Sequence, residues 1–228
     1  MITAYVINGK KELNSRGFHR IYDLSFEAWH KTWEKTYSLD FHSSDKLASD
    51  EFTRQDEILC LFSGNECAAL CFFSNVNMND QSALLDSYFQ CWPEDAIAGL
   101  VARGSSIIIC SQFTVCENFR KTGAPELGNS PWKILLIGML CKYFMASGKD
   151  GMTGTTRVNK GVEKLTYQFG AIPLVRSMEY NAGSDTTLVD LVAFFQDNVY
   201  KAYYNYEFAG ELDELWENRN AKRLKIAA

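Results

Sequence analysis

The chain has 228 residues, of which 46% are hydrophobic and 22% are charged, and its formal net charge is −5 at pH 7. This length suits one sizeable domain with a buried core, and the acidic balance argues against a nucleic-acid-binding protein, which normally carries a basic excess. The seven cysteines form no Cys-x-x-Cys pair and the three histidines lie far apart, so we expect a reducing, cytoplasmic location and no metal site.

The N-terminal half is predicted to alternate strands and helices. Its first apolar run follows no basic leader, and its long helix is indicated by apolar residues at three- and four-residue steps. A Ser-Gly-Asn-Glu turn between two apolar runs indicates a hairpin. The predicted elements are, in order, a strand (1–7), a helix (16–37), a polar loop (38–55), two hairpin strands (57–62 and 66–73) and helical segments broken by Pro93 (81–102).

The central segment, residues 105–170, carries the most specific pattern. An apolar strand (105–115) runs into a cationic turn, Asn-Phe-Arg-Lys-Thr-Gly-Ala (118–124), and a helix capped at Ser130-Pro131 is predicted to follow. A short strand and a second helix that ends at Phe169-Gly170 complete the unit. A strand that leads into cations and backbone amides at a helix N-terminus is typical of a binding site for a phosphate-bearing anion.

The C-terminal part is predicted to contain two strands, one helix and a solvated basic tail. These elements are, in order, a strand (171–180), a turn (181–185), a strand (186–194), a helix (196–219) and the tail (220–225). The complete order predicts a single α+β domain over 1–228, with a mixed, mostly antiparallel sheet flanked by helices. The core of its binding site is 105–170, and the C-terminal helix and tail occupy 196–228.

Coenzyme A is the phosphate-bearing ligand that this order of elements fits best. Arg120 and Lys121 would give charge-assisted hydrogen bonds to its pyrophosphate, and Gly123 would let the backbone come close to the phosphates. The amide-rich pantetheine arm would pair, like an added strand, with the backbone beside Thr114 and Val115.

Two segments carry a resemblance to a known family. Val115-Cys-Glu-Asn-Phe-Arg-Lys-Thr-Gly-Ala resembles the acyl-CoA-binding signature of the GNAT superfamily of N-acetyltransferases, and the segment 159–170, Asn-Lys-Gly-Val-Glu-Lys-Leu-Thr-Tyr-Gln-Phe-Gly, resembles a later segment of the same superfamily. The resemblance implies a GNAT-like acyl-CoA N-acyltransferase fold and a coenzyme A thioester, acetyl-CoA or a longer acyl-CoA, as co-substrate. The residues that it implies as contacts of this co-substrate are Thr114, Val115, Arg120, Lys121, Gly123, Ala124 and Asn159.

A branch of this superfamily is similar over a further stretch. Residues 50–61, Asp-Glu-Phe-Thr-Arg-Gln-Asp-Glu-Ile-Leu-Cys-Leu, look like the block before the hairpin in acyl-homoserine-lactone synthases and in the related long-chain N-acyl amino acid synthases. Ile109 and Gln112 stand where the lactone synthases carry glutamate and arginine, so the resemblance implies transfer to a different amine. Thr166 stands where the superfamily commonly has a tyrosine acid, with Tyr167 beside it.

Acyl transfer to an amine requires a neutral amine, an oriented thioester and stabilisation of the tetrahedral oxyanion. A backbone N–H at a strand bulge near Thr114 is expected to polarise the thioester carbonyl, and a carboxylate is expected to take the ammonium proton. Asp50, Asp56 and Glu117 are the candidate catalytic carboxylates, and the sequence does not rank them.

The sequence therefore predicts an N-acyltransferase that moves an acyl group from acyl-CoA or acyl carrier protein to a primary amine, such as an amino acid. The alternatives are a catalytically silent GNAT-like module for ligand sensing or protein interaction, and a conventional acetyl-CoA-dependent acetyltransferase. No membrane span is expected, because the longest apolar stretch (132–146) is short and contains lysines. Cys110 and Cys116, which flank the binding strand, are interpreted as packing residues.

Overall fold

The computed structural model describes residues 1–40, 47–182 and 185–221. Its main element is a seven-stranded sheet in the order β1-β2-β3-β4-β7-β9-β8, in which every pair of neighbours is antiparallel except β4 and β7. The predicted α+β class with a mixed, mostly antiparallel sheet is thus confirmed. The strands are β1 (Ile2–Asn8), β2 (Glu57–Ser63), β3 (Glu66–Asn77), β4 (Ser106–Val115), β7 (Gly151–Arg157), β8 (Ile172–Ala182) and β9 (Asp185–Phe194).

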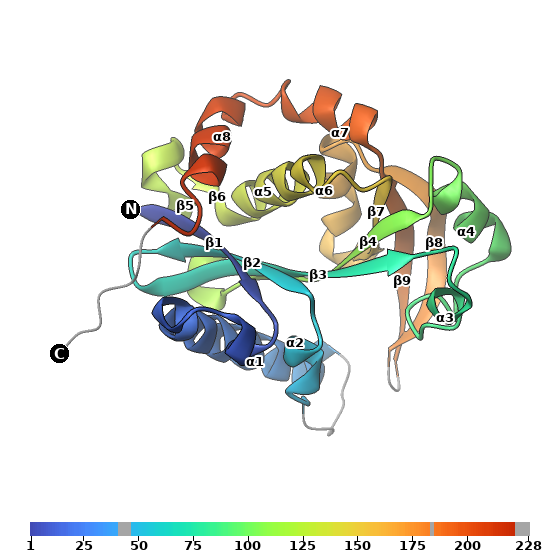
Figure 1. Cartoon of the computed structure of the whole chain (residues 1–228), viewed down its shortest axis with the longest axis horizontal. Coiled ribbons are helices and arrows are strands. Elements are labelled where there is room, and N and C mark those ends of the chain that lie inside the picture. Colours follow the sequence, from blue (N-terminus) through green and yellow to red (C-terminus); the bar gives the residue numbers. More distant parts are fainter. Residues whose placement is uncertain (41–46, 183–184, 222–228) are drawn as a thin grey trace.

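Helices cover both faces of this sheet (Figure 1). One face carries α5, α6, α7 and α8, and the other carries α1 and α2 at one end and α3 and α4 at the end near β8. The helices are α1 (His19–Asp40), α2 (Asp50–Thr53), α3 (Gln81–Leu84), α4 (Glu94–Val101), α5 (Trp132–Ser147), α6 (Val162–Gln168), α7 (Gln196–Tyr203) and α8 (Ala209–Glu217).

The central strands are apolar on both faces because both faces are covered. In β4 the side chain of Ile108 belongs to the apolar cluster under α5, whereas Ile107 and Ile109 belong to the cluster under α3 and α4. The unbroken Ile-Ile-Ile run is therefore a strand that contributes to two cores at once. This explains why the sequence showed no alternation of apolar and polar residues there.

Helix α5 is buried on nearly all sides, between the sheet and helices α7 and α8. Its approach to α8 is close at Gly138, where an added Cβ atom would lie 2.5 Å from Cδ1 of Leu212. Trp132, at the start of the helix, is 2% exposed and packs against Phe119 with ring centroids 5.3 Å apart. In the described part of the chain, no helix combines the length and the apolar character needed to cross a membrane.

Two predicted helix boundaries are wrong. Helix α5 begins one residue later than predicted: Pro131, not Ser130, is its N-cap residue, without a side-chain capping hydrogen bond. Ser130 and Pro131 also form the short strand β6, which pairs with β5 (Gly123–Ala124) in a separate two-stranded sheet. The predicted C-terminal helix over 196–219 is two helices, α7 and α8. The chain leaves the helical path after Tyr203 because Tyr206 packs on Phe169, with ring centroids 5.4 Å apart, and no proline or glycine marks this break.

The remaining predicted elements need smaller adjustments. The first helix begins later and ends later than predicted, after a 3-10 turn at Arg16–Phe18, and the polar loop contains the short helix α2. In the predicted turn over 181–185, residues 183 and 184 lie outside the described residues, and so do residues 222–228 of the predicted basic tail.

The two ends of the described chain meet at the edge strand β1. The backbone N–H of Asn220 donates to the carbonyl of Ala4 at 3.0 Å. Its side chain accepts from the N–H of Val6 at 2.9 Å and donates to the carbonyl of Val6 at 3.2 Å. One asparagine thus satisfies backbone groups on the outer side of β1 that no neighbouring strand pairs.

The contact between α5 and α8 gives a stability prediction. Gly138→Ala should lower the free energy of unfolding by about 1–3 kcal/mol, because the new methyl group overpacks the fully buried Leu212. Gly210→Ala is the matched control, since Gly210 is helical and an added Cβ there meets nothing within 4 Å; it should stabilise by about 0.4–1 kcal/mol. Urea unfolding of the three proteins tests this, and equal effects of the two substitutions would contradict the described packing.

Candidate functional site

The parallel strands β4 and β7 start side by side and then separate. Their pairing covers only three residue pairs, Ile107–Ile109 with Gly151–Thr153, although β4 continues to Val115 and β7 to Arg157. Beyond Ile109, β4 is paired with β3 on one side only. A cleft lies between the diverging ends, lined by residues 113–115 from β4 and by Arg157 from β7.

A β-bulge in β4 accompanies the separation. The register with β3 shifts between Leu70, opposite Thr114, and Phe72, opposite Ser111. Between these two pairs β4 has two residues, Gln112 and Phe113, where β3 has only Cys71. Gln112 has a φ of 52°, which lies in the left-handed region that residues other than glycine rarely adopt. The structure thus has a bulge next to Thr114, where the sequence analysis expected one.

Two tryptophans of α1 hold this bulge. The indole N–H of Trp33 donates to Oγ1 of Thr114 at 2.8 Å, and that of Trp29 donates to Oε1 of Gln112 at 3.3 Å. The Thr114 hydroxyl in turn donates to the carbonyl of Gln112 at 2.6 Å. Trp29 and Trp33 lie one helical turn apart, so a single face of α1 fixes both ends of the bulge.

The cleft is apolar on its walls and has a volume of about 360 Å³, which lies within the range of about 300–1,000 Å³ that is common for small-molecule sites. Its walls come from α1, β4 and the start of α6. The apolar wall residues are Trp33, Phe113, Val115, Val162 and Leu165.

The charged residues that line the cleft are all cationic. They are Arg120 from the turn after β4, Lys133 from the first turn of α5, Arg157 from the end of β7 and Lys160 from the 3-10 turn Val158–Lys160. Among the described residues no aspartate or glutamate lines the cleft. In a chain with a net charge of −5, such a grouping favours an anionic ligand.

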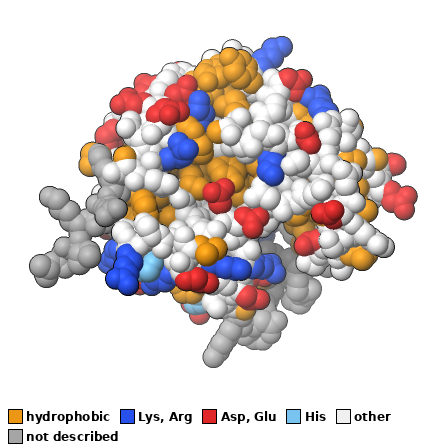
Figure 2. Space-filling view, in the orientation of Figure 1, with side chains coloured by type: hydrophobic (Ala, Val, Ile, Leu, Met, Phe, Trp, Pro, Cys, Tyr) orange, Lys and Arg blue, Asp and Glu red, His pale blue; other side chains and the backbone are white. Residues whose placement is uncertain are grey.

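A second, larger cavity is lined by charges of both signs, unlike the cleft. It has a volume of about 730 Å³, and carboxylates and cations line it together: Asp56, Glu57, Lys149 and Arg219. The face of the molecule in Figure 2 likewise shows basic and acidic side chains interspersed around apolar ones. The one-sided charge of the cleft between β4 and β7 is therefore not a general property of the surface.

The cationic turn after β4 is built differently from the prediction. Nε of Arg120 donates to the carbonyl of Val115 at 3.0 Å, which holds the side chain against the end of β4. Gly123 lies so close to Asn129 that an added Cβ would be 1.8 Å from its carbonyl oxygen. This glycine is thus required by the β5–β6 hairpin, whatever its relation to a ligand.

The other predicted contacts of coenzyme A divide between the cleft and its surroundings. Thr114 and Val115 line the cleft together with Arg120. Lys121 is exposed and outside the lining, and the side chain of Ala124 is fully buried in the core under α5. Asn159 is exposed, directly before the lining residue Lys160.

Thr166 and Tyr167 both have partners within the protein. The Thr166 hydroxyl is buried and donates to the carbonyl of Glu163 at 2.8 Å. The phenol of Tyr167 donates to the buried carboxylate of Asp190, which also accepts from the N–H of Ser177 at 2.6 Å. Burial and this hydrogen bond to Asp190 raise the pKa of Tyr167. The phenol therefore keeps its proton, which is engaged in the hydrogen bond to Asp190.

The three predicted catalytic carboxylates are not brought together. Asp50 is exposed at the start of α2. Asp56 accepts from the N–H of Asn75 at 2.7 Å and lines the second cavity. Glu117 is paired with Lys35 at 2.6 Å, and the hydrogen bond and charge of Lys35 lower the pKa of its carboxyl group.

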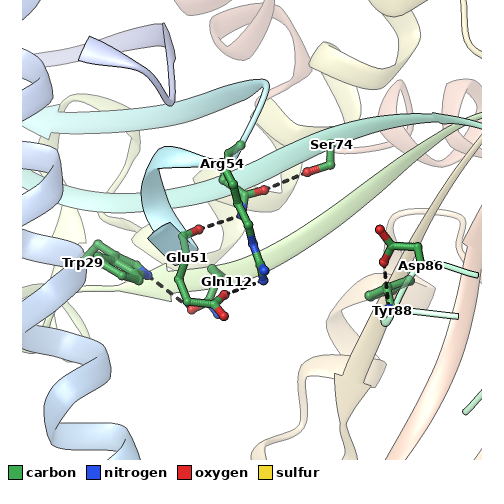
Figure 3. Close-up of polar contacts among 8 residues, drawn as sticks. Trp29, Glu51, Arg54, Ser74, Asp86, Tyr88 and Gln112 are labelled. Atoms are coloured by element: carbon green, nitrogen blue, oxygen red, sulfur yellow. Dashed lines mark hydrogen bonds and ion pairs between the residues drawn. The ribbon is translucent and has the colours of Figure 1, made fainter. Parts of the chain in front are cut away.

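Glu51 of α2 is a further carboxylate, next in the chain to Asp50. Figure 3 shows it paired with Arg54 at 2.9 Å. The adjacent residue Phe52 packs on Trp29, with ring centroids 5.4 Å apart, so α2 is fixed against the tryptophan that bonds Gln112. The side chain of Glu51 is 31% exposed.

Three cations of the cleft were also missed: Lys133, Arg157 and Lys160. The sequence places them 13 to 40 residues after Arg120, and nothing in their spacing indicates that they converge. Lys133 follows a helix start that was predicted one residue too early, and Arg157 ends a strand whose divergence from β4 has no signal in the sequence. Among the described residues, no group of three or more His, Cys, Asp or Glu side chains could hold a metal ion.

Comparisons with known proteins come from structure alone. No protein-family model and no curated protein sequence matches the chain. A solved structure of the CoA-dependent acyl-homoserine lactone synthase BjaI, with MTA, is similar with a TM-score of 0.58 and 10% identity, over 94% of this chain and 100% of that one.

Two further solved structures are similar over comparable lengths. The N-acyl amino acid synthase FeeM from uncultured soil microbes has a TM-score of 0.56 and 12% identity, over 92% of this chain and 98% of that one. A probable acetyltransferase from Staphylococcus epidermidis has a TM-score of 0.51 and 13% identity, over 86% and 99%. Identities this low establish the fold and nothing finer. The chain therefore has the GNAT-like acyl-CoA N-acyltransferase fold that its central motifs indicated.

Proposed function

We propose that residues 1–228 form one N-acyltransferase domain that moves an acyl group from acyl-CoA, or from acyl carrier protein, to the primary amine of an amino acid or a related small molecule. The observation that carries this proposal is the cleft between β4 and β7, which four cationic residues and no described carboxylate line. The similarity to CoA-dependent and N-acyl amino acid synthases supports it as an analogy of fold.

The co-substrate would bind along the unpaired edge of β4. The backbone beside Thr114 and Val115 lies past the last pair with β7, so the amides of pantetheine would take the place of the missing strand. Arg120, Lys133 and Lys160 would bind the phosphates. In this arrangement the exposed Lys121 and Asn159 are secondary contacts, and Gly123 and Ala124 act by shaping the turn.

The acyl group would lie against the apolar walls of the cleft. Trp33, Phe113 and Leu165 offer more apolar surface than an acetyl group covers. The shape therefore favours an acyl chain longer than acetyl, and this separates the proposal from a conventional acetyltransferase.

The reaction would proceed by direct attack of the neutral amine on the thioester carbon. The new C–N bond forms, the carbonyl oxygen carries the developing negative charge, and the C–S bond then breaks to release coenzyme A as its thiolate. A backbone N–H at the bulge near Thr114 would stabilise the oxyanion. Before the attack, the ammonium form of the substrate would give one proton to a carboxylate and so become the neutral amine. The released thiolate would be protonated from water, because Tyr167 is engaged with Asp190.

Among the carboxylates, Glu51 is the one that we propose as this base. It lies on α2, whose Phe52 packs on Trp29, the residue that donates to Gln112 of the bulge. Glu117 is a weaker candidate because Lys35 lowers its pKa, Asp56 lines a different cavity, and Asp50 points from the exposed end of α2.

The catalytically silent module remains a second candidate on one specific observation. Neither Thr166 nor Tyr167 has a proton free for a leaving thiolate, since each donates to a partner within the protein. A silent module would bind coenzyme A thioesters and never turn them over.

The first prediction concerns binding. Arg120→Ala should weaken the affinity for coenzyme A about tenfold or more, because a charge-assisted hydrogen bond contributes about 1.5–3 kcal/mol. Lys121→Ala removes an exposed charge from the same turn and should cost less than about 1 kcal/mol. Thermal-shift titration with coenzyme A measures both, since a ligand that binds the native state raises the melting temperature. An absence of any shift with the wild-type protein would remove coenzyme A as the ligand and leave the carrier protein.

The second prediction concerns chain length. If the apolar walls hold the acyl group, affinity should increase from acetyl-CoA through hexanoyl-CoA to decanoyl-CoA, by up to about 0.8 kcal/mol for each methylene that is buried. Isothermal titration with the thioester series measures this, and Leu165→Ala should flatten the increase while leaving the affinity for coenzyme A itself unchanged. Affinities that are equal along the series would favour a conventional acetyltransferase.

The third prediction concerns catalysis. In the series Asp50→Asn, Glu51→Gln, Asp56→Asn and Glu117→Gln, only Glu51→Gln should lower kcat strongly, by about 10² or more. The KM for acyl-CoA should not change, because Glu51 does not line the cleft. Release of the coenzyme A thiol, followed with a thiol reagent in the presence of an amino-acid mixture, measures the rates. Binding without thiol release for any amine would support the silent module.

A further inference from the structure

Two cysteines meet in a third cavity, next to the cleft. This cavity has a volume of about 270 Å³ and lies between α1 and the ends of β3 and β4. Cys67 near the start of β3 and Cys116 directly after β4 both line it. It shares two lining residues with the cleft, Thr32 and Arg120.

The backbone places the two thiols across neighbouring strands. The N–H of Cys116 donates to the carbonyl of Ala68 at 2.9 Å, so residue 116 lies opposite the neighbour of Cys67 in the antiparallel pair. The side chains line the same cavity from neighbouring strands, so the two thiols lie on the same side of the sheet. The Cys67 thiol donates to the carbonyl of Ala69 at 3.8 Å, and the two thiols also shift each other's pKa.

The two thiols differ in exposure and in acidity. Cys116 is half-buried, whereas Cys67 is 6% exposed. The neighbouring Cys67 thiol lowers the pKa of Cys116, and the Thr32 hydroxyl and the charge of Arg120 act in the same direction against the effect of burial. The neighbouring Cys116 thiol and burial together raise the pKa of Cys67. The interpretation of Cys116 as a packing residue is thus incomplete, because its acidity depends on groups from α1 and β3 that are remote in sequence.

We propose that Cys116 and Cys67 form an oxidisable pair, in which Cys116 is the reactive thiol and Cys67 the resolving thiol. With hydrogen peroxide as oxidant, the Cys116 thiolate attacks one peroxide oxygen, the O–O bond breaks, and Cys116 becomes a sulfenic acid while hydroxide leaves. The sulfur of Cys67 then attacks the sulfenic sulfur and loses its proton, and the hydroxyl leaves as water. Two thiols are oxidised to one disulfide and one peroxide is reduced to two waters.

Oxidation of this pair would reach the cleft through Arg120. The guanidinium that lowers the pKa of Cys116 also lines the cleft and is tied to the carbonyl of Val115. A disulfide removes the ionisable Cys116 thiol beside Arg120 and ties residue 116 covalently to β3. This consequence for ligand affinity rests on the proposed binding of coenzyme A, whereas formation of the disulfide does not.

A second thiol pair provides an internal contrast. Cys71 also has a neighbouring thiol, that of Cys110, but Cys71 is fully buried within the sheet, and burial raises its pKa, with a smaller contribution from Cys110. A thiol that is protonated and away from water reacts slowly. The two pairs therefore differ. Of the two, only the pair of Cys67 and Cys116 lines the third cavity and contains a thiol whose pKa is lowered, that of Cys116.

The experiment is a titration of the native full-length protein with hydrogen peroxide. The wild-type protein should lose two of its seven thiols, and non-reducing peptide mapping should find the cross-link between residues 67 and 116. Cys91→Ser, which removes an exposed cysteine, should still lose two thiols. In Cys67→Ala and Cys67→Ser, Cys116 should instead accumulate as a sulfenic acid that dimedone traps, and in Cys116→Ser Cys67 should remain reduced.

The outcomes separate this inference from the proposed function. A native protein that keeps all its thiols, or that first cross-links Cys71 with Cys110, would overturn the pair, even if the reduced protein binds coenzyme A. A disulfide that forms in a protein with no affinity for coenzyme A in either redox state would leave the pair intact and refute the ligand. If both hold, oxidation should weaken the affinity for coenzyme A about tenfold, the loss of one charge-assisted contact, and a thiol reductant should restore it.

Discussion

The bulge in β4 is the constraint on which the site depends. A parallel pair of strands normally stays paired along its length, yet β4 leaves β7 after three residue pairs. A non-glycine residue in the left-handed region, such as Gln112, costs of the order of 1–3 kcal/mol, and such a conformation persists only where its surroundings determine it. Here the surroundings are the indole N–H groups of Trp29 and Trp33. One turn of α1 therefore delivers two donors to one strand.

The cations that line the cleft come from several different elements of the fold. Arg120 is oriented by the carbonyl of Val115, Lys133 by the start of α5, and Lys160 by a turn that follows β7. Among the described residues no aspartate or glutamate lines the cleft beside them, so its lining carries charge of one sign. The hairpin of β5 and β6, which requires Gly123, connects the end of β4 to the start of α5. It therefore sets the distance between Arg120, which follows β4, and Lys133 in the first turn of α5.

Much of the fold was predictable from the sequence because it depends on local patterns. The apolar runs of β2, β3 and β4 and the periodicity of α1 each identify an element within a single window. The division of the C-terminal helix was not predictable, because Tyr206 leaves the helix to pack on Phe169, a residue 37 positions earlier. The convergence of Lys133, Arg157 and Lys160 is likewise a property of the assembled sheet. The functional pairing of Cys67 with Cys116 arises only from strand register, and a single window of sequence contains no information on it.

The contact between Asn220 and β1 has a consequence for how the chain is completed during synthesis. The first strand leaves the ribosome early, but the residue that satisfies the outer N–H of Val6 is added 214 residues later. Until then β1 presents an open edge, the kind of surface through which nascent chains pair with one another. Asn220 therefore closes this edge of the sheet, and a chain that ends before residue 220 would leave the outer side of β1 open to pairing with another strand.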